Sequence, residues 1–133
     1  MIRLNIKDAI ESYNKKHGGT ITQAEFGALV IPEEHPDTYK QILISSWGKG
    51  KRLNLVKPTH IIAICEASGI GLTDLLHLNK YAHPPTEKEA YEYARLLAEM
   101  DRKNTCYIAL VIWLCKNFKI APDFIFYNDY LTR

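Results

Sequence analysis

Apolar residues recur every three or four positions along most of this 133-residue chain, whereas strict alternation of apolar and polar residues is scarce. Such spacing places an apolar stripe along one side of a helix, so the pattern predicts an all-α protein. The periodicity indicates five short helices between residues 5 and 79. Two longer helices are expected between residues 86 and 118.

Capping signals set the expected ends of these helices. His17, Gly18 and Gly19 should end the first helix, because Gly readily adopts the left-handed conformation that closes a helix. Thr22 and Glu25 have the spacing of a capping box, in which side chain and backbone bond reciprocally. Further expected caps or first-turn residues are Asn5, Asp37 or Thr38, Pro58, Thr73, Thr86 with Glu89, and Asn104 or Thr105.

The third helix and the turn after it form the most distinctive stretch. Residues 38–57 contain five Lys or Arg and no Asp or Glu, although the whole chain has a formal net charge of only +2. The apolar arc of the helix carries Tyr39, Leu43 and Trp47. The opposite side carries Gln41, Ser45, Gly48 and Lys49. Amide, hydroxyl and ammonium groups without an acid can bond base edges and do not repel phosphates.

Composition and motifs argue against several other classes. The start of the chain has no apolar signal-peptide core, and the longest apolar run, residues 106–115, is too short to cross a bilayer. Three cysteines in apolar surroundings suit a reducing cytoplasm. The histidines and cysteines lack metal-ligand spacing, and no phosphate loop or catalytic carboxylate pair occurs. We therefore expect a cytoplasmic protein that is not an enzyme and has no cofactor or metal.

Two segments carry a family resemblance. The sequences ISSWGKGKR (44–52) and IIAICEASGIGLTDLL (61–76) resemble lambda-repressor-like (XRE-type) helix-turn-helix domains. TQAEFG (22–27) is similar to the start of the second helix in that family. The resemblance covers roughly residues 3–79. It implies a five-helix DNA-binding domain over residues 1–83, followed by a smaller C-terminal helical region over residues 84–133.

The resemblance implies sequence-specific binding of double-stranded DNA by a nucleoid-associated transcriptional regulator of the bacterial or phage type, such as a repressor. The implied base contacts are Gln41, Ser45 and Ser46. The implied phosphate contacts are Gln23, Lys40, Lys49, Lys51 and Arg52. A homodimer is expected, because one module of this kind covers little DNA surface, and the aromatic region 104–130 is the candidate for dimerisation.

The chain departs from the family pattern at two places. Gly48 stands where the family usually has Glu, and the connection IPEEHP before the third helix is about seven residues longer. The longer connection could change the angle at which that helix is presented. The alternative is a protein-interaction module or antitoxin-like partner on the same scaffold. Exposure of Gln41, Ser45, Lys49 and Arg52 on one basic face distinguishes the two, because a DNA reader cannot be buried.

Overall fold

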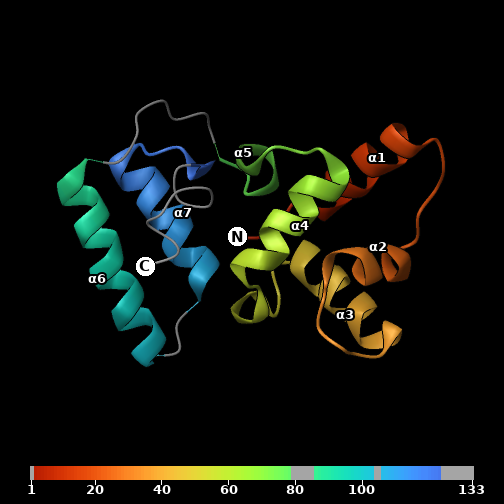
Figure 1. Ribbon diagram of the computed structural model, residues 1–133, viewed down its shortest axis with the longest axis horizontal. Helices are drawn as coiled ribbons and strands as arrows, with labels where there is room; N and C mark the ends of the chain where they lie inside the picture. The colour runs from red at the N-terminus through yellow and green to blue at the C-terminus, as the bar shows by residue number, and fades with distance from the viewer. Residues whose placement is uncertain (1, 79–85, 104–105, 124–133) are drawn as a thin grey trace.

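A computed structural model describes residues 2–78, 86–103 and 106–123 of the chain. Over these residues it contains seven α-helices and one 3-10 turn, which confirms the all-α prediction (Figure 1). The elements are α1 (Ile6–His17), α2 (Gln23–Val30), α3 (Asp37–Gly48), the turn η1 (Leu53–Leu55), α4 (Pro58–Ser68), α5 (Leu72–Leu75), α6 (Glu87–Lys103) and α7 (Tyr107–Phe118).

Most of the expected helix ends are confirmed. Gly18 and Gly69 follow α1 and α4 in the left-handed conformation, and Pro58 is the first residue of α4. Both capping boxes form: the Glu25 amide donates to Thr22 Oγ1 at 3.1 Å, and the Glu89 amide donates to Thr86 Oγ1 at 3.2 Å.

Two expected caps are wrong. Pro36 precedes α3 without a side-chain cap, so the helix already begins at Asp37. Gly71 precedes α5, which places Thr73 inside the helix. Asn5 stands at the N-cap position of α1 as expected, but its side chain donates to Asp8 and makes no capping bond. The expected caps Asn104 and Thr105 lie outside the described residues.

The core of the first five helices is built from fully buried apolar side chains. Each of three helices contributes two side chains that are fully buried: Phe26 and Val30 of α2, Ile44 and Trp47 of α3, and Ile61 and Ile64 of α4. Helix α2 packs closely on α3, where a Cβ on Gly27 would lie 3.1 Å from the carbonyl oxygen of Lys40. The lack of a side chain at Gly27 therefore permits this helix crossing.

Helix α7 lies between α6 and the first five helices, and α6 lies at the end of the molecule remote from α1, α2 and α3 (Figure 1). The buried residues of α7 include Ile108, Val111 and Leu114, and α7 packs against η1. The expected boundary at residue 83 lies outside the described residues. Within the described part of the chain, no helix is long and apolar enough to cross a membrane.

Candidate nucleic-acid interface

Helix α3 buries its apolar arc and leaves its polar side accessible. Leu43 and Trp47 are buried, Gln41 and Lys49 are exposed, and Ser45 is half-buried. The three polar residues are spaced four apart, so they lie one turn above another on the same side of the helix. The described residues of the C-terminal half therefore leave the predicted reader residues Gln41 and Ser45 accessible.

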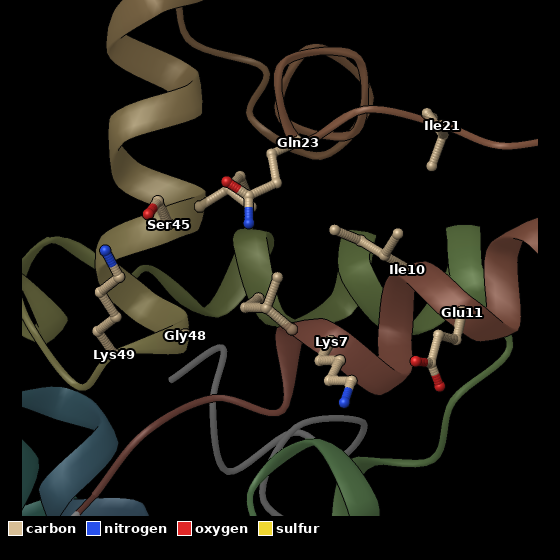
Figure 2. A pocket seen from close by; sticks show the side chains of 10 residues that line it. Lys7, Ile10, Glu11, Ile21, Gln23, Ser45, Gly48 and Lys49 are labelled. Atoms are coloured by element: carbon tan, nitrogen blue, oxygen red, sulfur yellow. The ribbon is translucent and has the colours of Figure 1, made fainter.

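A hollow of about 420 Å³ lies beside this polar side, between α1, the start of α2 and the end of α3 (Figure 2). Gln23, Ser45 and Lys49 line one part of it, and Lys7 and Glu11 of α1 line another. The remaining lining is Ile6, Ile10, Ile21, Ile44 and Gly48. The fold thus brings together three predicted site residues from two helices, and Glu11 is the only acid among the described residues of the lining.

Gln23 owes its position to the capping box at the start of α2. Glu25 accepts a hydrogen bond from the Thr22 amide at 3.2 Å, and Thr22 accepts one from the Glu25 amide. These bonds fix the first turn, so the exposed Gln23 begins the helix at a defined place. The positive end of the helix dipole at this position favours a nearby anion.

The basic turn after α3 is a fixed structure. The Lys51 amide donates to the Ser46 carbonyl at 2.8 Å, and the Gly50 amide donates to the Trp47 carbonyl at 3.2 Å. Gly50 has a positive φ of 77°, so the turn is a Schellman motif. Lys49 and Lys51 are both exposed on it. Their backbone positions are therefore set by the end of the helix.

Arg52 folds back onto α3, which corrects the expectation for Ser46. The Arg52 Nη1 donates to Ser46 Oγ at 2.8 Å, and Ser46 is only 6% exposed. The Arg52 carbonyl also accepts a hydrogen bond from the Trp47 indole at 3.1 Å. A buried hydroxyl that is already bonded cannot read a base, so Ser46 is not a base contact in this conformation. Arg52 remains exposed and keeps free donors.

Lys40 also has a role within the fold. Its Nζ donates to the Ile31 carbonyl at 2.9 Å, and the side chain is half-buried. Ile31 directly follows α2, so the ammonium ties the end of α2 to the first turn of α3. One of the three ammonium donors of Lys40 is thus used within the fold, and its expected phosphate contact stays a prediction.

The longer connection before α3 is anchored by Glu33. Its carboxylate oxygens each lie 2.9 Å from Nε2 of the buried His60, and Lys57 Nζ lies 3.2 Å away. The His60 Nδ1 accepts a hydrogen bond from the Lys57 amide at 3.1 Å, so Nε2 carries the proton and donates to Glu33. Partial burial raises the pKa of Glu33, but the hydrogen bonds from His60, the backbone and Lys57 outweigh it and lower this pKa to about 2.

Gly48 lines the hollow beside α3. A Cβ at this position would lie 3.4 Å from the Cβ of Ile6, which is close to an ordinary van der Waals contact. The packing against α1 therefore does not by itself require Gly at this position.

The two buried cysteines, Cys65 and Cys115, are not suited to act as nucleophiles. Burial raises the pKa of both Cys65 and Cys115 to about 12, with a smaller contribution from Asp123. The thiols are therefore protonated and poorly nucleophilic at neutral pH. Among the described residues, no group of His, Cys, Asp or Glu side chains is arranged to hold a metal ion.

Comparisons with protein-family models, with curated proteins and with solved structures found no match to this chain.

Proposed function

We propose that this protein binds double-stranded DNA sequence-specifically through α3 and acts as a transcriptional regulator of the bacterial or phage type. The observation that carries the proposal is the convergence of Gln23, Ser45 and Lys49 on one hollow, with Gln41 exposed one turn before Ser45. These groups lie on an accessible helix face that bears no acid between Gln41 and Lys49.

In this mechanism α3 enters the major groove with Gln41 and Ser45 toward the base edges. The Gln41 amide can bond N6 and N7 of adenine together, which discriminates adenine from the other bases. Ser45 either donates or accepts, so it adds affinity with less selectivity. Gln41 is therefore the main specificity residue of the proposal.

The phosphate contacts fall to residues on either side of that reader. Lys49, Lys51 and Arg52 lie on the fixed turn after α3, and Gln23 lies at the start of α2. Cations that neutralise phosphates release counterions and supply affinity without reading the sequence. The proposed site thus separates the residues that specify from those that position.

The anchored connection supports the proposal, because a reader helix needs a defined orientation. Lys40 ties α3 to the carbonyl of Ile31, where the connection begins, and Glu33 ties the middle of the connection to His60 of α4. The connection is therefore held by two side-chain hydrogen bonds. A longer connection does not by itself loosen α3.

We further propose that the protein acts as a homodimer through its C-terminal half. Tyr91 of α6 is 75% exposed and Trp113 of α7 is 48% exposed, so both helices offer aromatic surface. Two copies would double the contacts available from one small module. Residues 104–105 and 124–130 of the region expected to dimerise lie outside the described residues.

Selection of binding sites from a pool of random duplexes tests the proposal. The protein should enrich a defined sequence motif, and Gln41→Ala should relax the selection at one position or at adjacent positions. Lys51→Ala should weaken binding to all duplexes alike while leaving the enriched motif unchanged. Failure of the wild-type protein to enrich any motif would contradict sequence-specific recognition.

A second candidate function is binding of another protein, and one observation favours it. Leu29 of α2 is 55% exposed and Ile42 of α3 is 46% exposed, and exposed aliphatic side chains suit a protein partner. Leu29→Ser with Ile42→Ser should abolish partner binding in that case. The same double variant should keep the salt-dependent affinity for DNA if the leading proposal is correct.

A further inference from the structure

A second hollow, of about 220 Å³, lies away from the proposed DNA-binding site. It is formed where the N-terminal segment, the end of α5 and the middle of α7 meet. Its lining is Ile2, Arg3, Leu76, His77, Ile112 and Lys116. None of these residues lines the hollow beside α3. The two hollows are therefore separate sites, so a ligand of the second hollow would not occupy the surface that α3 offers to DNA.

The polar lining of this hollow is entirely basic. Arg3, His77 and Lys116 come from three segments that are distant in the sequence, and no Asp or Glu among the described residues lines the hollow. Across the described part of the chain, none of these three side chains forms an ion pair or hydrogen bond with another residue. Cations gathered without a counter-charge create a local positive potential that attracts an anion.

The N-terminal segment that carries Arg3 is held in place by its neighbours. The Leu4 amide donates to the Trp47 carbonyl at 3.1 Å, and the Asn5 amide donates to the Leu75 carbonyl at 2.9 Å. The backbone of Arg3 is thereby fixed against both α3 and α5. Less conformational entropy is then lost when the guanidinium orders around a ligand.

His77 is held at the hollow by an uncommon backbone conformation. Its φ is 54°, in the left-handed region that few residues other than Gly adopt. The next residue, Leu78, is buried and donates its amide to the Thr73 carbonyl at 2.8 Å. The packing of Leu78 therefore maintains the turn that places His77 in the lining, and the strain is offset by the surrounding fold.

We propose that this hollow binds a small phosphorylated molecule through its phosphate group. The planar guanidinium of Arg3 can bond two phosphate oxygens at once, Lys116 supplies a compact charge, and His77 supplies a further ring N–H. Ile2, Leu76 and Ile112 form apolar walls that reduce competition from water. A phosphate group matches three donors of this kind better than a carboxylate, because it offers more acceptor oxygens.

The position of the hollow gives such a ligand a regulatory role. It would connect the N-terminal segment and α5 to α7, and so connect the proposed DNA-binding helices to the proposed dimerising half. A ligand that binds residues of both halves stabilises the arrangement in which they meet. The small phosphorylated molecule would therefore act as an effector of the regulator.

Isothermal titration with inorganic phosphate at low ionic strength tests the site. We expect saturable binding with one site per chain, while chloride at matched ionic strength gives none. Arg3→Gln and Lys116→Gln should each raise the dissociation constant about tenfold, which corresponds to the loss of one charge-assisted hydrogen bond. Lys88 is an exposed lysine on α6, so Lys88→Gln is the matched control and should leave the dissociation constant unchanged.

Two further measurements keep the result interpretable. The His77 ring resonances should shift on addition of phosphate to the wild-type protein and should not shift in the double variant Arg3→Gln/Lys116→Gln. An unchanged melting temperature of the double variant without phosphate verifies that the fold is intact. No saturable binding by the wild type, or equal binding by the double variant, would overturn the proposal.

Duplex DNA distinguishes a small ligand from a DNA phosphate. The double variant should bind a short duplex as tightly as the wild type, because the hollow is expected to lie outside the DNA contact. If the double variant instead loses as much duplex affinity as Lys51→Ala, the hollow belongs to the DNA-binding surface and the effector site is refuted.

Discussion

The carboxylate of Glu33, in the connection before α3, accepts a hydrogen bond from Nε2 of His60 in α4, with both oxygens at 2.9 Å. His60 is buried, and its ring lies 5.1 Å from the ring of Trp47 in α3. The bond thus joins the connection to the place where α3 packs on α4. It anchors the part of the chain that could otherwise leave α3 without a defined orientation.

Glu33→Gln should make the free energy of unfolding less dependent on pH in the acidic range. The pKa of Glu33 is about 2 in the folded protein, against an ordinary value of 4.5. A lowered pKa contributes stability that is fully present above pH 4.5 and is lost as the pH falls from 4.5 to 2. The variant should therefore be less stable than wild type at pH 7, by about 1 kcal/mol, with the difference vanishing toward pH 2.

Urea unfolding at pH 7, 4 and 3 measures this difference. Glu34→Gln is the matched control, because Glu34 is adjacent, exposed and without a hydrogen bond or ion pair among the described residues. Equal losses in the two variants, at every pH, would mean that the anchoring bond contributes nothing.

Gly27→Ala should destabilise the protein by about 1–2 kcal/mol, because overpacking forces neighbouring atoms to shift. The new Cβ would lie 3.1 Å from the Lys40 carbonyl oxygen, and backbone atoms cannot move aside as a flexible side chain can. Gly19→Ala is the control, since nothing lies within 4 Å of a Cβ there. In chemical denaturation, the free energy of unfolding of Gly27→Ala should be well below that of Gly19→Ala. The reverse order would refute the close helix crossing.

Arg52→Ala should weaken both folding and DNA binding, whereas Lys51→Ala should weaken DNA binding alone. Arg52 donates to Ser46 and closes the turn, so its removal should cost about 1 kcal/mol of stability. Lys51 is exposed, and no side-chain hydrogen bond or ion pair is found for it within the described residues. Thermal unfolding combined with a duplex-binding assay separates the two effects. Equal melting temperatures for both variants would show that the Arg52 bond to Ser46 does not stabilise the turn.

Trp113→Ala should shift the protein from dimer to monomer if α7 contributes to the dimer. The side chain is 48% exposed and packs edge-on against Phe118, with ring centroids 5.9 Å apart, so truncation removes surface rather than core. Light scattering coupled to size-exclusion chromatography gives the mass of each species. A wild-type protein that is monomeric at tens of micromolar would remove the dimer from the proposal.

Features with local causes were predictable from the sequence. The two capping boxes, Gly18 after α1 and Pro58 at the start of α4 each depend on residues within one helical turn. The polar side of α3 followed from helical periodicity in the same way. Such features need no knowledge of tertiary contacts.

Features with distant causes were not predictable. Glu33 and His60 are 27 residues apart, and nothing in the sequence around either one indicates the pairing. The resemblance implied a base contact by Ser46, but the fold brings Arg52 back onto α3 through the left-handed turn, where it bonds the Ser46 hydroxyl. Lys40 similarly bonds a carbonyl nine residues earlier. In each case a polar side chain meets a partner that only the fold brings close.

The most direct measurement of the central claim is the salt dependence of duplex binding, followed by fluorescence anisotropy. Each phosphate that is neutralised contributes about −0.9 to the slope of log affinity against log salt, so Lys49, Lys51 and Arg52 predict roughly −2.7 per protomer. Lys51→Ala should reduce the slope by about 0.9, while Lys88→Ala should leave it unchanged. No measurable affinity at low salt, or a slope that Lys51→Ala does not alter, would contradict DNA binding through α3 and its turn.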